Sequence, residues 1–239
     1  MASKLTLKLK NAEITFKVVK RANQKRIIVK PDFFGYQVSA PSTATLKAIK
    51  QMILVNQNAI LNMPTRLDFK SLLKKPSNIK LFGKDYPIVY RKENGGVVFN
   101  DDLIVVKSKS LNENNIERLL YQFLKTHLIQ SALTIHHQTK QTHPHFPLDG
   151  VDFDARYAHT KFGTCYPSTK LIRFNLVLVH YPIEYLKFIY YHEISHLKHA
   201  NHSKAFYETF TAFEPHHKSL KKSLERYHED YMRDTKNHI

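Results

Sequence analysis

The stretch YYHEISHLKHANH, residues 190–202, contains four histidines and one glutamate. His192, Glu193 and His196 form the pattern H-E-x-x-H, and on an α-helix residues four apart lie on the same face, so both imidazoles can reach one ion. Because the chain has 15 histidines, this pattern is expected by chance with a probability of roughly 0.04, and a further histidine at a set position lowers that to about 0.003. The spacing therefore favours a metal site over a helix that is merely rich in histidine.

Glu193 follows the first histidine directly, which places a carboxylate beside the ion without using it as a ligand. A metal lowers the pKa of a bound water toward ~7, and a neighbouring carboxylate can accept the proton as the water attacks. Zinc suits imidazole ligands best, since it has no geometric preference of its own. The pattern thus predicts a zinc-dependent hydrolase in which Glu193 activates a zinc-bound water.

Two histidines compete for the place of the third ligand. His199 lies on nearly the same helix face as His192 and His196, but a straight helix would carry it about one turn beyond the ion, at ~1.5 Å rise per residue. The chain must turn before a third imidazole can return, and residues 200–201 suit this because asparagine tolerates the left-handed conformation that ends helices. We therefore predict that His202 completes the zinc site with the helical pair, and that His199 stays outside the ligand set.

The remaining histidines and the charged residues divide the chain into two halves. No histidine precedes His127, and the clusters at 136–137 and 143–145 are either solvated or a second metal site. Residues 1–110 hold 21 Lys and Arg against 7 Asp and Glu, whereas residues 111–239 hold 16 against 13. We predict a basic β-rich region at 1–110 and a catalytic core at 111–239, two parts that could also form one compact unit.

Hydrophobic periodicity predicts an α+β fold. Alternating apolar and polar residues indicate short strands in the first part of the chain, at 5–9, 13–19, 26–30 and 34–39. Farther on, an apolar stripe predicts a long helix over about 112–140, and two strands are expected at 151–159 and 171–179. Pro182 suits the first turn of the helix that carries the H-E-x-x-H pattern.

Other features limit where such a protein would act. No apolar run approaches the roughly 20 residues that span a bilayer, so we expect no membrane segment. Residues 1–13 alternate Leu with Lys and Thr, unlike the apolar centre of a signal peptide. A single cysteine, Cys165, excludes an internal disulfide framework. We therefore expect a cytoplasmic protein, whose oligomeric state the sequence does not specify.

The residues around the pattern resemble a known family. HEISHLKHANHSKAF at 192–206 is similar to the signature of the YgjP-like metallopeptidase domain, in which H-E-x-x-H is followed by Asn-His-Ser and an aromatic residue. KFGTC at 161–165, LIRFN at 171–175 and KRIIVKPDFFGYQVSAP at 25–41 are also similar to it. This resemblance covers nearly the whole chain. It implies a small gluzincin-like core, related to SprT-like domains, with the H-E-x-x-H helix packed on a sheet and zinc on the three predicted histidines.

The favoured interpretation is a zinc metallopeptidase that acts on a peptide or protein substrate. Two alternatives stay open. The same chemistry could hydrolyse a phosphoanhydride, because the basic first half would attract an anionic nucleotide. Zinc could also hold together the helices of a nucleic-acid-associated binding protein, although structural zinc sites normally close with four ligands. The net charge of +17 is equally compatible with a role in solubility.

Overall fold

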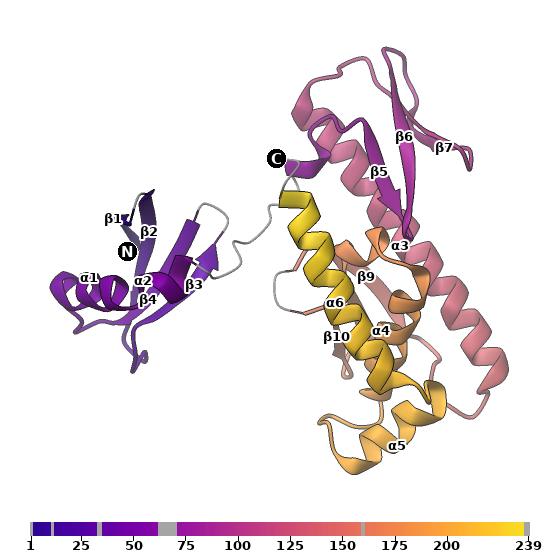
Figure 1. Cartoon of the computed structure of the whole chain (residues 1–239). Coiled ribbons are helices and arrows are strands. Elements are labelled where there is room, and N and C mark those ends of the chain that lie inside the picture. The colour runs from indigo at the N-terminus through magenta and orange to yellow at the C-terminus, as the bar shows by residue number, and fades with distance from the viewer. Residues whose placement is uncertain (1, 11, 33–34, 62–70, 159–160, 237–239) are drawn as a thin grey trace. The chain divides into compact units, whose positions relative to one another are not determined.

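The computed structural model of the protein describes residues 2–10, 12–32, 35–61, 71–158 and 161–236. The chain forms two compact units, residues 1–68 and residues 69–239 (Figure 1). Within the described residues, no helix is both long enough and apolar enough to cross a membrane.

The first unit is a four-stranded sheet with two helices packed on one face. Its strands, in spatial order, are β1 (Ala2–Leu9), β2 (Ala12–Arg21), β4 (Gly35–Pro41) and β3 (Ile28–Asp32). The helices are α1 (Leu46–Val55) and α2 (Gln57–Leu61). Ile49, Ile53 and Ile60 from the helices share one buried core with alternate strand residues, such as Phe16 and Val38. The apolar and polar residues that alternate in the sequence therefore point to opposite faces of the sheet, one buried and one open.

The second unit begins with another four-stranded sheet, which packs on a long helix. Its strands, in spatial order, are β5 (Asn78–Leu81), β6 (Lys84–Arg91), β8 (Ile104–Lys107) and β7 (Gly96–Phe99), preceded by a 3-10 turn, η1 (Ser71–Leu73). Helix α3 (Glu113–Thr142) starts where the side chain of Asn112 accepts a hydrogen bond from the backbone N–H of Asn115. Most of the predicted apolar stripe of α3 is buried, at Ile116, Leu120, Leu124 and Leu128, while Leu119 and Phe123 are half-buried.

A three-stranded sheet and three helices complete the second unit. The strands, in the spatial order β10-β11-β9, are β10 (Gly163–Tyr166), β11 (Leu171–Asn175) and β9 (Asp152–Arg156). A 3-10 segment, η2 (Leu176–His180), leads to α4 (Ile183–Ser195), α5 (Lys204–Phe213) and α6 (His217–Lys236). Helix α4 contacts β10, α3, α5 and α6, so it lies at the centre of this unit. The predicted α+β class, with a β-rich N-terminal region, is confirmed.

The division into units differs from the predicted boundary between residues 110 and 111. Strands β5 to β8 belong to the second unit, because their side chains and backbone join its core. The ring of Phe99 in β7 lies 6.4 Å from that of Phe123 in α3. The carbonyl of Lys80 in β5 lies 2.8 Å from Nδ1 of the buried His180. Charge and histidine content change near residue 110, whereas the packing changes near residue 68.

Candidate metal centre

Helix α4 supplies the first part of the H-E-x-x-H pattern from a mostly buried position. The helix begins after Pro182, as its sequence predicts, and carries Glu184 in the first turn. Its apolar residues Leu186 and Ile194 are fully buried. This burial fixes the rotation of the helix, so that His192 is presented to the pocket described below.

The end of helix α4 agrees with the turn expected at residues 200–201. The helix itself ends at Ser195 with His196 as its C-cap, hydrogen-bonded turns continue through residue 198, and the chain bends at residues 200 and 201. The backbone N–H groups of His196 and Leu197 donate to the carbonyls three residues back, at 3.1 and 3.0 Å, which tightens the last turn toward 3-10 geometry. The tightened turn and the bend at residues 200–201 together bring His202 back to the helix within six residues of His196.

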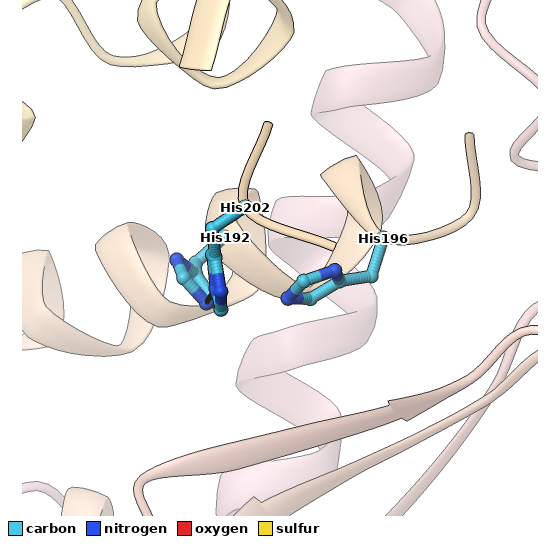
Figure 2. A group of neighbouring side chains, drawn as sticks. All are labelled: His192, His196 and His202. Atoms are coloured by element: carbon cyan, nitrogen blue, oxygen red, sulfur yellow. Dashed lines mark hydrogen bonds between the residues drawn. The ribbon is translucent and has the colours of Figure 1, made fainter. Parts of the chain in front are cut away.

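His192, His196 and His202 come together at this helix end. One ring nitrogen of each lies within 4.8 Å of those of the other two, and Figure 2 shows the three rings gathered beside the last turn of α4. The Nε2 atoms of His192 and His202 are 3.1 Å apart. Burial, with the two neighbouring imidazoles, lowers the pKa of His192 to about 4. The ring is therefore neutral at physiological pH and keeps a lone pair for a cation.

His199 is engaged elsewhere. Its Nε2 lies 2.9 Å from Oγ1 of Thr209 in α5, and its backbone carbonyl lies 2.9 Å from Nδ1 of His196. A carbonyl can only accept, so Nδ1 of His196 carries the proton and Nε2 is left free as a ligand atom. The backbone of His199 thus orients a predicted ligand, while its side chain lies outside the group.

The other histidine clusters do not gather in the same way. His136 shares a hydrogen bond with Tyr190, at 2.9 Å, and His137 pairs with Gln141 at 3.0 Å. The ring of His143 packs on Phe213. Across the residues that the structure describes, the group at 192, 196 and 202 is the one set of three or more His, Cys, Asp and Glu side chains with this convergence.

Glu193 lies beside the histidines in a nearly closed environment. The residue is only 5% exposed. Its carboxylate accepts a hydrogen bond from the backbone N–H of Cys165 in β10 and lies near the charge of Lys161. Both of these lower the pKa of Glu193, but burial outweighs them and raises it to about 7. A carboxyl group with such a pKa exchanges protons easily near neutral pH, as a general base must.

Gly163 makes room for this carboxyl group. A Cβ atom at Gly163 would lie 2.6 Å from Oε1 of Glu193 and 2.9 Å from its Cδ. No side chain other than hydrogen therefore fits between the edge of β10 and Glu193. Sequence reasoning did not assign Gly163 a role, although an isolated glycine within a strand is a recognisable sign of close approach by another group.

Asn175 fixes the segment just before β10. The side chain is buried, and its Oδ1 accepts hydrogen bonds from the backbone N–H groups of Ala158 and Val177, at 3.1 and 3.2 Å. Its Nδ2 donates to the carbonyls of Ala158 and Lys161, at 2.7 and 3.0 Å. The strand predicted over 171–179 therefore stops at Asn175, where the side chain caps the 3-10 segment η2 instead. The edge of β10 is thereby held against Glu193.

Gly163→Ala should separate the base from the metal site. We expect a loss of hydrolysis of about 100-fold, because displacing a catalytic group by roughly 1 Å has this effect. Metal content should stay close to that of the wild type, since the three atoms nearest to the new methyl group all belong to Glu193 and not to a histidine. Steady-state kinetics and metal analysis of the purified variant test this. Gly96→Ala is the control: a Cβ there meets no atom within 4 Å, but the φ of +89° strains an alanine, so this variant should melt at a lower temperature and keep its hydrolytic activity. Equal losses of hydrolysis in both variants would contradict the assigned role of Gly163.

His192, His196 and His202, together with Glu193, line a pocket of about 770 Å³. Residues 161–165 and Pro167 form one wall, and α4 and the turn after it form the floor. Aromatic side chains of α4 and α5 add apolar surface, and α6 closes the far side with Lys221, Leu224 and Glu225. Nothing in the local sequence of α6 marks these residues, since they reach the site only through the packing of α6 on α4.

Comparisons with known proteins identify a family. The family model for the YgjP-like metallopeptidase domain matches residues 25–227, which is most of the chain. Among solved structures, the metallopeptidase zymogen of Methanocaldococcus jannaschii jannalysin is similar at 17% identity with a TM-score of 0.35, over 40% of this chain and 95% of that chain. No curated protein matches significantly. The resemblance expected from residues 192–206 is thus confirmed at the level of the family.

Proposed function

We propose that this chain, which belongs to the YgjP-like metallopeptidase domain family, hydrolyses peptide bonds with zinc held by His192, His196 and His202. The observation that carries the proposal is the position of Glu193. Among the described residues that line the pocket it is the one buried carboxylate, and it lies next to three converging imidazoles rather than among them. This arrangement separates the metal ligands from the base, as a hydrolytic centre requires.

The donor set fits zinc. Two nitrogens bound tetrahedrally at about 2.0–2.1 Å from one zinc are about 3.3 Å apart, and Nε2 of His192 and Nε2 of His202 are 3.1 Å apart. Three imidazoles, with no fourth protein ligand in the group found among the described residues, match a catalytic site rather than a closed structural one. When bound, zinc would supply Lewis acidity toward a carbonyl oxygen and toward a water molecule.

Glu193 performs the proton transfer in this proposal. The cation would favour its ionised form and offset part of the rise in pKa that burial causes. The carboxylate accepts a proton from the attacking water and later gives it to the leaving amine. The N–H of Cys165 and the wall at Gly163 hold the carboxyl group in one orientation, which keeps its oxygens toward the substrate throughout the reaction.

The shape of the pocket supports a peptide as substrate. Strand β10 lines the pocket and lies at the edge of its sheet in the described part of the chain. An edge strand can pair with an extended peptide through backbone hydrogen bonds. Lys161 and Lys221 also line the pocket and would suit a phosphate, but Lys221 is 4.0 Å from the carboxylate of Glu225, so its charge is partly compensated.

Removing and restoring zinc tests the proposal. We expect a purified sample to cleave a mixture of unstructured peptides, to lose this activity after chelation, and to regain it with one equivalent of zinc per chain. Nucleoside triphosphates, assayed in parallel, should release no phosphate above the background of the chelated sample. Phosphate release without peptide cleavage would favour the phosphoanhydride alternative. Zinc-dependent folding without either activity would favour a structural metal.

A further inference from the structure

The open face of the sheet in the first unit carries a row of positive charges. The buried face packs on α1 and α2 through Phe16, Val38 and their neighbours, so residues of the opposite parity point away from the helices. Lys4 of β1 is the register partner of Lys17 in β2, Lys17 is the partner of Gln37 in β4, and Gln37 is the partner of Lys30 in β3. The row crosses all four strands, and its three lysines are exposed.

This arrangement is unfavourable for the isolated unit. Like charges directly opposite each other in a sheet destabilise it. Residues 1–68 contain 12 Lys and Arg against 3 Asp and Glu. Glu13 faces Lys8 across the first two strands, but among the described residues of this unit no side chain forms an ion pair with Lys4, Lys17 or Lys30. An anionic partner would relieve this repulsion.

We propose that this open face, defined by Lys4, Lys17, Gln37 and Lys30, binds the phosphate backbone of duplex nucleic acid. Strands lie about 4.8 Å apart, so a row over four strands spans about 14 Å. That length is close to the width of about 12 Å of the major groove of DNA, so that lysines at the two ends can contact phosphates of both strands. Each contact releases condensed counterions, which supplies affinity without sequence preference.

The neighbouring side chains fit this partner better than a single strand. Thr6 and Thr15 stand opposite each other, with their hydroxyls 3.0 Å apart, on the same face as the lysines. Hydroxyl and amide groups such as these and Gln37 bind phosphate oxygens. The described residues of this face include no aromatic ring, whereas proteins that bind single strands stack bases on aromatic side chains. A face that contacts only the nucleic-acid backbone favours the duplex, because a duplex carries about twice the charge per unit length of a single strand.

Binding of a fluorescent 20-base-pair duplex by the full chain tests the proposal. We expect a linear fall of log affinity with log salt concentration. The variant Lys4→Gln/Lys17→Gln/Lys30→Gln should bind at least about tenfold more weakly and lower the salt slope by about two to three. The control Lys47→Gln/Lys50→Gln/Lys109→Gln removes the same charge from exposed residues of α1 and of the segment after β8. It should bind almost as tightly as the wild type.

Further measurements distinguish binding by this open face from a role of the metal centre and from a general effect of net charge. Glu193→Gln should bind the duplex like the wild type, because the proposal does not depend on the metal centre. The triple variant of the row should not melt at a lower temperature than the wild type, since it removes like-charge repulsion. If the triple variant of the row and the control variant lost the same affinity for the duplex, binding would depend on net charge alone and the proposal would be wrong. The proposal would also be wrong if the chain bound vesicles containing phosphatidylserine more tightly than the duplex, and if the triple variant of the row weakened that binding.

Discussion

Glu193→Gln should lower kcat/KM for peptide hydrolysis by about a thousandfold or more, within the range of general-base catalysis combined with electrostatic stabilisation. Glutamine has the same length and shape, and its side-chain oxygen can still accept the hydrogen bond from Cys165 that the carboxylate accepts. What it lacks is the ability to take a proton. The zinc content should not change, because Glu193 is not in the group of converging ligand atoms.

The control for this variant is available on the same helix. Glu184→Gln makes the identical chemical change in the first turn of α4, at an exposed position that does not line the pocket. It should retain full activity. Steady-state kinetics and metal analysis of both variants, with a thermal melt as a check on folding, make the comparison. A Glu193→Gln variant that still turns over peptide at the wild-type rate would remove Glu193 as the base.

The cluster itself could be predicted because it depends on local spacing. His192 and Glu193 lie in one helix, and His202 follows within a few residues, so helix geometry and the need for a turn limit the possible arrangements. The family resemblance rests on the same contiguous residues and extends to the glycine-containing segment at 161–165. The long helix α3 and the strands β9 and β11 near the site were predicted for the same reason, since their periodicity lies in neighbouring residues, whereas the short strand β10 was not predicted.

The remaining features depend on contacts between distant segments. The tightening of the chain just after Ser195, ahead of the expected bend at residues 200–201, was not predicted from the sequence. The role of Gly163 requires that β10 lie against Glu193, thirty residues later in the chain. The contribution of α6 to the pocket follows from its packing on α4. No periodicity within one segment contains this information, since packing partners are set by the whole core.

His202→Ala should weaken zinc binding by more than about 100-fold, a loss beyond that of removing an outer-shell partner. The change leaves two imidazoles, His192 and His196, on one short stretch of chain. The folded unit should persist without the metal, because His202 is exposed and contributes little to the core. Metal analysis after dialysis and competition with a chromogenic chelator give the affinity. The rise in melting temperature that zinc binding causes should disappear as well, since it depends on the same binding equilibrium.

His199→Ala is the matched control, because it makes the same substitution three residues earlier in the same turn. It removes the hydrogen bond to Thr209 but keeps the backbone carbonyl that faces Nδ1 of His196. We therefore expect a slightly lower melting temperature and nearly unchanged zinc affinity, because the ligand set stays complete. If His199→Ala lost zinc while His202→Ala retained it, the third ligand would be His199, and the turn at residue 196 would have to rearrange when the metal binds.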